Sequence, residues 1–291
     1  MKELRGKTAI VTGASRGIGR AVALQLAAAG MRVVLTARSA DGLRAVQEQV
    51  EARGGEAHIV PGDIRSAALR EQLLAETKER FGPPHVLVNN AGIELVLPFD
   101  QTPPEEIAGL LETNLVAAIL LTRLVVPEML ALGEGHIVNV ASMAGKRAPA
   151  YNAVYAASKA GLLLFTQGLR AELRPRGVSA SAVAPGLVSG DGMYADLIRG
   201  RQIKTPLMLG SVPVEKVARA VLKAIREDHP ELVVWRGPIR PAAVLFEASP
   251  RLAERIVPFF GANRLFGQIA QEELAAREAR AAVDGVSPGR A

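Results

Sequence analysis

Hydrophobic and polar positions along the chain follow two alternating periods. Short runs rich in valine and isoleucine, such as residues 8–11, are typical of strands buried on both faces of a sheet. Between these runs, apolar residues recur three or four positions apart, as in residues 17–29, which predicts helices. Gly30 directly follows that segment, where a helix C-terminus favours glycine. The pattern therefore predicts alternating strands and helices from the start of the chain.

This alternation predicts a parallel sheet. We expect strands at residues 8–11, 32–36, 57–60, 85–88, 136–140, 178–183 and 232–235, and helices at 17–29, 40–53, 66–81, 104–132, 151–173 and 214–226. Pro127 is expected to bend or break the long helical segment that contains it. Strands that alternate with helices of this length form βαβ units with right-handed crossovers. The predicted fold class is α/β: a single Rossmann-like, doubly wound parallel sheet of about seven strands, with helices on both faces and a C-terminal helical extension.

The composition of the sequence changes near residue 237, beyond which prolines become frequent. We predict that residues 1–237 form the sheet domain and that residues 238–291 form a helical extension packed on the same domain. The extension has apolar residues between 252 and 269, with arginines among them. It is a candidate subunit contact, a cover for a substrate pocket, or an amphipathic helix on a membrane. Pro258 and Gly261 interrupt the pattern, which favours packing within an oligomer over a membrane-lying helix.

Composition narrows the class of protein. Of the 291 residues, 49% are apolar and 4% are aromatic, so aliphatic side chains must build most of the core. The sequence has no cysteine, which excludes disulfides, thiol catalysis and cysteine-ligated metal, and we predict no metal site. It shows neither a signal peptide nor an uncharged stretch of membrane-spanning length. We therefore expect a soluble, cytoplasmic protein.

The formal net charge of +6 raises the question of a nucleic-acid partner. The arginines are scattered along the predicted helices and mixed with glutamates, and the sequence has no dense basic tract with interleaved aromatics. Solvated helix faces account for this pattern. We therefore predict no nucleic-acid partner.

A glycine-rich turn stands between the first strand and the first helix. Residues 12–19 read Thr-Gly-Ala-Ser-Arg-Gly-Ile-Gly, so the spacing is Gly-x-x-x-Gly-x-Gly. Glycines permit a tight turn and close approach of the backbone to a phosphate, and a helix N-terminus offers unpaired N–H groups to an anion. A plain turn is the alternative. The strand before the turn and the helix after it favour a phosphate or pyrophosphate site.

The end of the second strand bears on which dinucleotide would bind. An NAD site usually has an Asp or Glu near this point to accept from the ribose 2′-hydroxyl, whereas this chain has Arg38. Arg38, together with Arg16 in the glycine-rich turn, is suited to bidentate bonds with a 2′-phosphate. The alternative is that both are solvated surface arginines. Two cations without an acid favour NADP(H).

Two further segments lie at the carboxyl edge of the predicted sheet, where ligands of open α/β sheets bind. Asp63 follows the third strand and is placed to accept from an adenine amino group; an ordinary turn or N-cap aspartate is the alternative. The fourth strand ends in Asn89, Asn90, Ala91 and Gly92, whose small residues let the backbone pass close to a flat ligand. Asparagines that only tie turn backbone together are the alternative here.

A candidate catalytic set follows the fifth strand. Ser142 comes after that strand, and Tyr155 and Lys159 stand four residues apart on the next predicted helix, so their side chains share one face. A nearby cation favours the phenolate, which would bring the pKa of Tyr155 down towards the working range of a proton shuttle. Ser142 would hold the substrate oxygen while Tyr155 gives or takes its proton. A purely structural role would explain each of these residues alone. It would not explain their occurrence together, in this order, after the glycine-rich turn.

This ordered set resembles the short-chain dehydrogenase/reductase family over about residues 5–237. The resemblance rests on residues 12–19, Asp63, residues 89–92, Asn114, Ser142, Tyr155, Lys159, Pro185 and Gly186. It implies that Asn114 belongs to the active site and helps a water-linked proton relay through Lys159. It also implies that Val188 contacts the nicotinamide carboxamide through its backbone. Many members have a threonine at the position of Gly190, so here Ser189, beside it, is the nearest substitute.

The residues and the resemblance together predict where NADP(H) binds. The predicted cofactor-binding residues are Gly13, Ser15, Arg16, Gly17, Ile18, Gly19, Arg38, Asp63, Ile64, Asn89, Ala91, Gly92, Tyr155, Lys159, Pro185, Gly186 and Val188. In this picture residues 1–237 form the dinucleotide-binding and catalytic domain. The arginines at positions 16 and 38 are similar to those of the NADP-preferring branch of the family.

The predicted activity is reduction of a carbonyl to an alcohol, or the reverse, by an NADPH-dependent oxidoreductase that acts on CH–OH groups. The predicted catalytic residues are Ser142, Tyr155, Lys159 and Asn114, and the predicted substrate contacts are Ser142, Met143, Val154, Tyr155, Leu187 and Met193. The segment after Gly186 is rich in apolar residues and resembles a flexible lid, so we expect a lipophilic ketone or aldehyde. We also expect a homodimer or homotetramer, as is common in the family.

Two other functions stay open from the sequence. A 3-oxoacyl thioester reductase of the fatty-acid type has the same site residues, although the long extension exceeds the compact reductases of that kind. A non-catalytic NADPH-binding sensor is the other alternative. The presence of all four predicted catalytic residues counts against a sensor, which would not need them.

Overall fold

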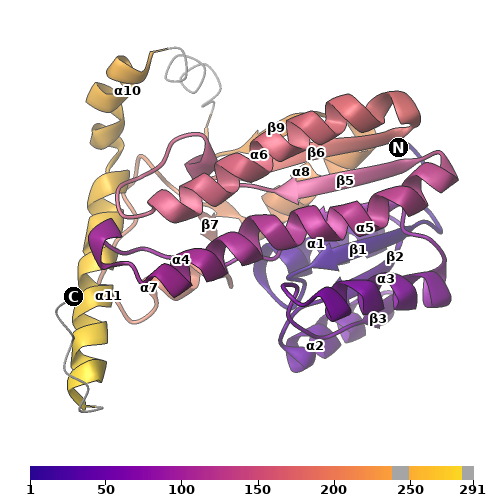
Figure 1. Cartoon of the computed structure of the whole chain (residues 1–291), viewed down its shortest axis with the longest axis horizontal. Coiled ribbons are helices and arrows are strands. Elements are labelled where there is room, and N and C mark those ends of the chain that lie inside the picture. Colours follow the sequence, from indigo (N-terminus) through magenta and orange to yellow (C-terminus); the bar gives the residue numbers. More distant parts are fainter. Residues whose placement is uncertain (238–248, 284–291) are drawn as a thin grey trace.

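The computed structural model describes residues 1–237 and 249–283 (Figure 1). Its strands are β1 Thr8–Thr12, β2 Arg32–Thr36, β3 Ala57–Ile59, β4 Val86–Asn89, β5 Gly135–Val140, β6 Val178–Pro185, β7 Val188–Ser189, β8 Val212–Pro213 and β9 Glu231–Val234. Its α-helices are α1 Gly17–Ala28, α2 Ala40–Glu51, α3 Ala67–Phe81, α4 Pro104–Leu111, α5 Ala117–Leu132, α6 Ala153–Leu173, α7 Met193–Ile198, α8 Val214–Glu227, α10 Pro250–Ile256 and α11 Ala262–Val283. Shorter turns of helix are Phe99–Gln101, Glu112–Val116, Met143–Gly145, Arg174–Arg176 and Val257–Phe260.

In the described ranges, a seven-stranded sheet forms the centre of the molecule, in the order β3-β2-β1-β4-β5-β6-β9. Each neighbouring pair of its strands is parallel. The chain winds outward from β1 to β3, then returns and continues from β4, so the order reverses between β1 and β4. This confirms the predicted doubly wound α/β fold. The reversal creates a crevice at the carboxyl ends of the strands, where such sheets bind ligands.

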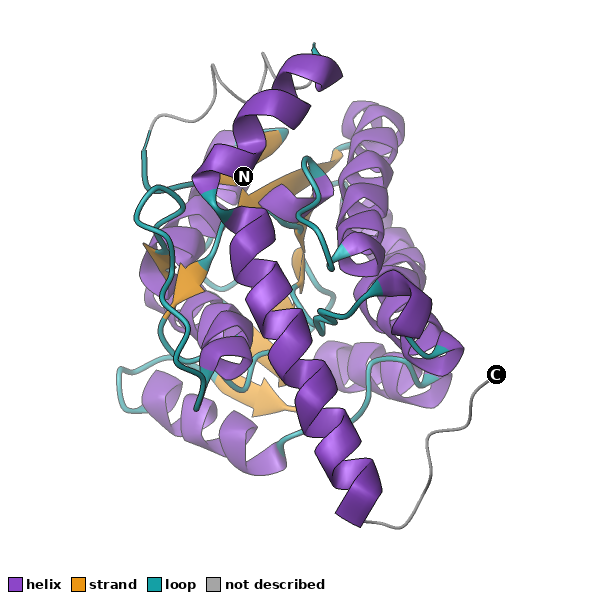
Figure 2. Ribbon diagram, turned by 90° about the vertical axis from the view of Figure 1, so that its left-hand side faces the viewer, coloured by secondary structure: helices purple, strands orange, loops and turns teal. Residues whose placement is uncertain are grey.

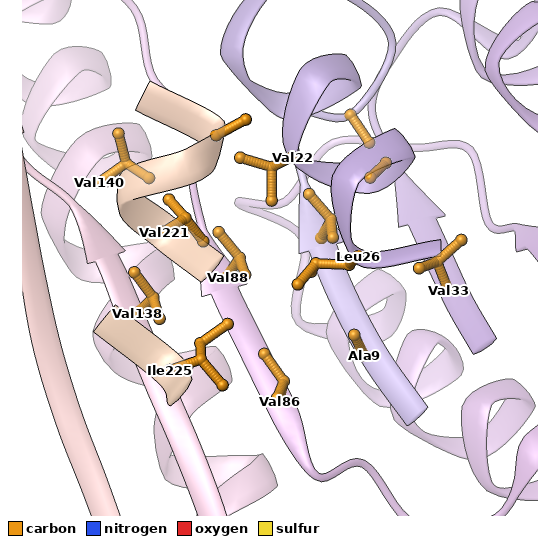
Figure 3. Packing of buried hydrophobic residues seen from close by; sticks show 14 of the residues in the cluster. Ala9, Val22, Leu26, Val33, Val86, Val88, Val138, Val140, Val221 and Ile225 are labelled. Carbon is orange, nitrogen blue, oxygen red and sulfur yellow. The ribbon is translucent and has the colours of Figure 1, made fainter. Parts of the chain in front are cut away.

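Successive residues of the strands point to opposite faces of the sheet, and helices cover both faces. On one face, Val11 and Leu35 belong to a core with residues of α1, α2 and α8. Figure 3 shows Val22 and Leu26 of α1 and Val221 of α8 on this face. The opposite face forms a second core with residues of α3, α5 and α6. Burial on both faces explains why the strands are apolar runs in the sequence.

The long helical segment after Pro104 is interrupted, but not where the sequence suggested. Pro127 lies inside α5, and the irregularity is instead a π-helical turn, Glu112–Val116, between α4 and α5. The expectation that Pro127 breaks the helix is therefore wrong. A π-turn adds one residue to a helical turn and recurs at functional sites. It places Asn114 in the buried interior of the protein.

Within the described ranges, Pro104–Leu132 is the one helical stretch whose length and composition would let it cross a membrane. Its residues Ala117, Leu121, Val125 and Met129 are buried in the core on the sheet. A core helix of a folded protein passes the same test of length and hydropathy. This burial accounts for the apolar composition of its inner side.

The C-terminal helices close the carboxyl edge of the sheet. Figure 1 shows α11 on the side of the molecule towards which the arrow of β5 points, and Figure 2 shows it crossing in front of the strands. Leu265, Phe266 and Ile269 of α11 form an apolar cluster with Val96 and Tyr194.

Two ion pairs fasten the far half of α11. Arg201 pairs with Glu273 at 2.6 Å, and Arg277 pairs with Glu106 of α4 at 2.6 Å. The helix is therefore held by segments that precede it by about 70 and 170 positions. The predicted boundary at residues 237 and 238 borders a segment outside the described ranges, so the division into two parts remains a prediction.

Candidate active site

A cavity of about 1110 Å³ opens at the carboxyl edge of the sheet. The turns that follow β1, β2, β4, β5 and β6 each contribute residues to its wall. Residues of α7 and of the C-terminal helices complete the wall on the side away from the sheet. The cavity therefore lies in the crevice where the strand order reverses, and it has the size of a site for a dinucleotide or a large ligand.

The glycine-rich turn forms one end of this cavity. Gly17 has φ of +56°, a conformation that favours glycine. A Cβ atom at Gly19 would lie 2.1 Å from the carbonyl oxygen of Gly13, so no other residue fits there without displacing the turn. Both glycines thus serve the shape of the turn rather than simple flexibility.

The N-terminus of α1 is left open to the cavity. Arg16 is its N-cap residue and its side chain makes no capping bond, whereas Ser39 and Ser66 cap α2 and α3. The first turn of α1 also holds no acidic residue. Uncapped N–H groups and the positive end of the helix dipole suit a bound phosphate. The cradle fits the phosphates of a dinucleotide.

The two predicted phosphate-binding arginines differ in their surroundings. Arg38 follows β2, lines the cavity and is exposed, and it has no ion-pair partner among residues 1–237 and 249–283. Arg16 is paired instead with Asp196 of α7, and its Nη1 lies 3.9 Å from Asp191. The hydrogen bond that Arg16 donates to Asp196 raises the pKa of Arg16. Arg38 is therefore the freer of the two for a 2′-phosphate.

Asp63 lines the cavity, but its carboxylate is already engaged. Arg65 donates to it from Nε at 2.9 Å and from Nη2 at 2.6 Å, and the Arg65 backbone N–H donates at 3.0 Å. These bonds hold the pKa of Asp63 below its usual range. The hydroxyl of Thr36, buried nearby in the cavity wall, has no hydrogen-bond partner within the described part of the chain. A polar ligand edge at this end of the cavity would supply one.

Ser142, Tyr155 and Lys159 meet at the centre of the cavity wall. Ser142 follows β5, and its hydroxyl accepts from the Ala144 backbone N–H at 3.1 Å. Hydrogen bonding with Ser142 lowers the pKa of the neighbouring Tyr155. Lys159 lies one turn further along α6, with Nζ 5.7 Å from the centre of the Tyr155 ring. Its ammonium donates to the carbonyl of Val140 at 3.0 Å, which fixes the head of a 3% exposed side chain.

The electrostatics of this cluster differ from the sequence-based expectation. Burial raises the pKa of Tyr155 above its ordinary value, the charge of Glu94 raises it further, and the bond with Ser142 offsets only part of this. Burial also lowers the pKa of Lys159 to about 8, although the charge of Glu94 opposes that shift. The expected lowering of the Tyr155 pKa by Lys159 is therefore wrong for this structure. Burial outweighs the attraction between the two groups.

Asn114 holds the turn after β4 rather than lining the cavity. Its Oδ1 accepts from the Ile93 backbone N–H at 2.8 Å, and its Nδ2 donates to the Ile93 carbonyl at 2.8 Å and to Ser158 at 3.2 Å. A Cβ atom at Gly92 would lie 3.2 Å from Asn114 Oδ1 and 3.5 Å from Lys159 Nζ. Asn114 thus fixes the segment that passes beside Lys159.

Most predicted site residues line the cavity. Those that do are Gly13, Ser15, Arg16, Gly17, Ile18, Arg38, Asp63, Ile64, Ala91, Gly92, Ser142, Met143, Tyr155, Lys159, Pro185, Gly186, Leu187, Val188 and Met193. The structure does not bring Asn89 there: it is buried, donating to Thr122 and Asn139. Gly19 lies behind the turn, and Val154 lines a smaller groove with Phe99 instead.

Several cavity residues were missed from the sequence. Asn90, not Asn89, reaches the glycine-rich turn, where its Nδ2 donates to the carbonyl of Thr12 at 2.9 Å. Phe260 and Phe266 come from the C-terminal helices and line the side facing α7. Glu94 also lines the cavity, and burial raises its pKa to about 7. A single acid in the apolar run after Gly92 was the available signal for it.

Comparison with known proteins agrees with this geometry. The family model for short chain dehydrogenases matches residues 7–199. Ketoacyl reductase HetN of Nostoc sp. strain PCC 7120 is 41% identical over 266 residues, which cover 90% of this chain and 91% of that protein. The 3-oxoacyl-[acyl-carrier-protein] reductase FabG of Escherichia coli strain K12 is 38% identical over 186 residues, covering 64% of this chain and 75% of the relative.

Two solved structures are similar in fold. A variant of actinorhodin polyketide ketoreductase, solved with NADPH, aligns with a TM-score of 0.75 and 33% identity over 81% of this chain and 98% of that one. A metagenomic short-chain oxidoreductase in complex with NADP aligns with a TM-score of 0.68 and 36% identity over 80% of this chain and 98% of that one.

Proposed function

This chain belongs to the short-chain dehydrogenase/reductase family, and from that premise we propose that it reduces the carbonyl of a lipophilic substrate with NADPH. The observation that carries the proposal is the meeting of Ser142, Tyr155 and Lys159 in one cavity with an uncapped helix N-terminus and Arg38. The relatives described as ketoacyl reductases support the same class of reaction. Reduction is the proposed direction; alcohol oxidation would use the same residues.

The residues proposed to hold NADP(H) are those of the cavity end near α1. The turn of Gly13 and Gly17, with the N-terminus of α1, would bind the pyrophosphate, and Arg38 would bind the 2′-phosphate. When bound, the nicotinamide supplies the hydride. Similar structures that contain NADPH or NADP support this choice of cofactor.

The protein's own part in the proposed reaction is to hold and protonate the substrate oxygen. Ser142, which lines the cavity with Tyr155, would donate to that oxygen, and the Tyr155 hydroxyl would pass its proton to it. A raised pKa keeps Tyr155 protonated at neutral pH, which suits an acid in reduction. Lys159, fixed by Val140, would stabilise the phenolate that forms once the proton has left.

The substrate end of the cavity favours an apolar molecule. Leu187, Met193, Leu209, Phe260 and Phe266 line it. These side chains come from the segment after β6 and from the C-terminal helices, which agrees with the predicted cover over the substrate. Of the open alternatives, a 3-oxoacyl thioester is favoured by the similarity to ketoacyl and 3-oxoacyl-[acyl-carrier-protein] reductases, and it is the first substrate class to test.

A second copy of the chain is the proposed partner. Leu120 of α5 and Leu164 of α6 expose 39% and 67% of their surface, so these neighbouring helices present apolar groups away from the sheet. Pairing of the two helices with those of another subunit would cover them, as expected for a homodimer or homotetramer. Light scattering after gel filtration would show a multiple of the monomer mass. A cytoplasmic location remains a prediction.

The test is a comparison of substrates and cofactors. We expect the protein to oxidise NADPH with 3-oxoacyl thioesters or medium-chain ketones, and to bind NADPH more tightly than NADH by fluorescence titration. Turnover of short hydrophilic carbonyls alone would contradict the lipophilic substrate class. Binding of NADPH without turnover of any carbonyl would favour the sensor instead.

A further inference from the structure

Glu94 is a charged side chain inside the substrate end of the cavity. It follows the Gly92 turn, which Asn114 holds through Ile93, so its backbone position is fixed. Its neighbours in sequence, Leu95 and Val96, face apolar surroundings, and Val96 packs on α11. An acid in this setting has a cost, because burial disfavours a carboxylate. A carboxyl group of this kind in a cleft is a candidate binding residue.

Asn152 is the partner of Glu94. Its Nδ2 donates to Glu94 Oε1 at 3.1 Å and to the Leu95 carbonyl at 3.3 Å. Asn152 is fully buried, and its Oδ1 has no hydrogen-bond partner in the described part of the molecule. The second oxygen of Glu94 has no partner there either. Of these two acceptors, only Glu94 lines the cavity, so Asn152 positions the carboxyl group and the second oxygen of Glu94 is left for a ligand.

The backbone around Asn152 is strained and held by the C-terminal helix. Tyr151 has φ of +63°, which a non-glycine residue rarely adopts. The Ala150 backbone N–H donates to the side chain of Asn263 at 2.9 Å, and the Tyr151 ring lies against Gly267 of α11. Backbone strain of this kind persists where surrounding structure enforces it, and it is concentrated at functional sites. Here α11 enforces the position of Asn152.

Three titratable groups face Glu94: Lys159 and Tyr155 of α6 and Tyr194 of α7. Lys159 favours the charged form of Glu94, whereas burial outweighs it and raises the Glu94 pKa to about 7. The Lys159 ammonium already donates to Val140. Tyr194 bonds Thr205 at 2.5 Å rather than Glu94. In the described structure Lys159 therefore supplies charge, and none of the three donates a hydrogen bond to the second oxygen of Glu94.

We propose that Glu94, positioned by Asn152, forms a polar subsite that binds a hydrogen-bond donor of the substrate, such as a hydroxyl, an amine or an amide N–H. The inference rests on the proposed carbonyl reduction, since Glu94 lies in the same cavity as Tyr155. The substrate would then be a lipophilic carbonyl compound with one donor group apart from the carbonyl. An acceptor in a closed cavity discriminates between ligands, because a ligand without the donor displaces water and leaves the acceptor unpaired.

The experiment compares matched pairs of ketones or 3-oxo thioesters of equal length. One member of each pair bears a hydroxyl or a primary amine, placed at successive carbons from the carbonyl, and the other bears hydrogen there. For one position, we expect kcat/KM to favour the donor-bearing member by about 10- to 100-fold. In Glu94→Leu this ratio falls towards one, and in Glu94→Gln it falls more for the amine than for the hydroxyl. A ratio is insensitive to general damage by the substitution.

Glu105→Gln, an exposed acid on α4, is the matched control and keeps the wild-type ratio. Equal kcat/KM for both members at every position, or an unchanged ratio in Glu94→Leu, would overturn the subsite. Calorimetric binding of the corresponding alcohols, with and without the second donor, gives the same comparison without turnover. Absence of any carbonyl turnover would therefore contradict the proposed function alone. Equal affinities for the alcohols with and without the second donor would contradict the subsite.

Discussion

The two ends of the cavity are built in different ways. The end proposed for the cofactor is a turn of eight consecutive residues, 12–19, whose backbone forms the surface and whose glycines are required by its shape. The substrate end is assembled from side chains of distant segments: Glu94, Met193, Leu209 and Phe266 are separated by up to 172 positions. The cofactor end is thus formed by local sequence, whereas the substrate end forms only when the fold brings distant segments together.

This difference decides what each end tolerates. The cofactor end is a surface of backbone atoms, so a Cβ atom added at one of its glycines disrupts it. Substitution of the side chains beside those glycines is tolerated better. A surface of side chains depends on which groups arrive, so its chemistry changes with single substitutions while the fold persists. The reacting residues stand between the two ends. The following changes separate the three regions.

Tyr155→Phe should have the largest effect, because it removes the proposed acid and leaves both ends of the cavity intact. We expect kcat to fall by about 100- to 10,000-fold. NADPH binding, measured by fluorescence, should be retained. The matched control is Tyr194→Phe, which removes the hydroxyl of the second tyrosine that lines the cavity and its bond to Thr205. A similar loss in both variants would contradict the role given to Tyr155.

Gly19→Val tests the backbone end. Its Cβ would lie 2.1 Å from the Gly13 carbonyl oxygen, so the turn must move. We expect NADPH affinity to fall by about 100-fold, since overpacking of a fixed site costs about 3 kcal/mol. Gly168→Ala in α6 is the control, because no atom lies within 4 Å of its added Cβ. Unchanged NADPH affinity in Gly19→Val would mean that the turn does not form the site.

Arg38→Ala tests the side-chain part of the cofactor end. We expect NADPH affinity to fall by about 10- to 100-fold, the value of charge-assisted bonds to a phosphate, with little change for NADH. Arg16→Ala should cost less, because Arg16 is already paired with Asp196. Titration of both cofactors against both variants gives the comparison. Equal losses for NADPH and NADH in Arg38→Ala would refute the assignment to the 2′-phosphate.

Glu94→Gln should have the smallest effect, and it concerns stability. The pKa of Glu94 is about 7 in the folded protein and near 4.5 when exposed, so the folded state binds more protons between these values. The free energy of unfolding contributed by Glu94 is therefore highest at low pH and declines as pH rises from about 4.5 to 7. Glu94→Gln should remove this decline, which is on the order of 1 kcal/mol per pH unit between the two pKa values.

Chemical denaturation at pH 5 and pH 8 measures the difference. The variant should gain stability over the wild type at pH 8 but not at pH 5, whereas Glu105→Gln should show no such change. A gain at pH 5 alone would reverse the predicted sign. Binding sites that require a buried charge commonly lower the stability of the folded protein, which is a trade-off between stability and function.

The fold and the cofactor end were predictable because their signals are local. Continuous apolar runs separated by segments of helical spacing predicted the seven strands of the main sheet, and the positions of Gly13 and Gly17 follow from the turn itself. Even so, Asn89 and Asn90 were exchanged in role. Adjacent residues of a strand point to opposite sides, and the pattern does not show which side faces the turn.

The substrate end was not predictable in the same way. Phe266 lines the cavity only because α11 folds back over residues that precede it by more than 70 positions, and no local period records that contact. The same holds for Arg16, whose partner Asp196 comes from α7. The sign of the Tyr155 pKa shift was missed because spacing shows a nearby cation but not the depth of burial.

The position of α11 also sets an order of events during synthesis. Chains emerge from the ribosome from the N-terminus and fold in that direction. The glycine-rich turn and the first six strands of the main sheet are complete by residue 185, when Leu265, Phe266 and Ile269 have not yet been made. In a nascent chain the nucleotide-binding turn would therefore form before the substrate end of the cavity. Translation arrested before α11 should yield a protein that still binds the nucleotide but has lost its substrate specificity.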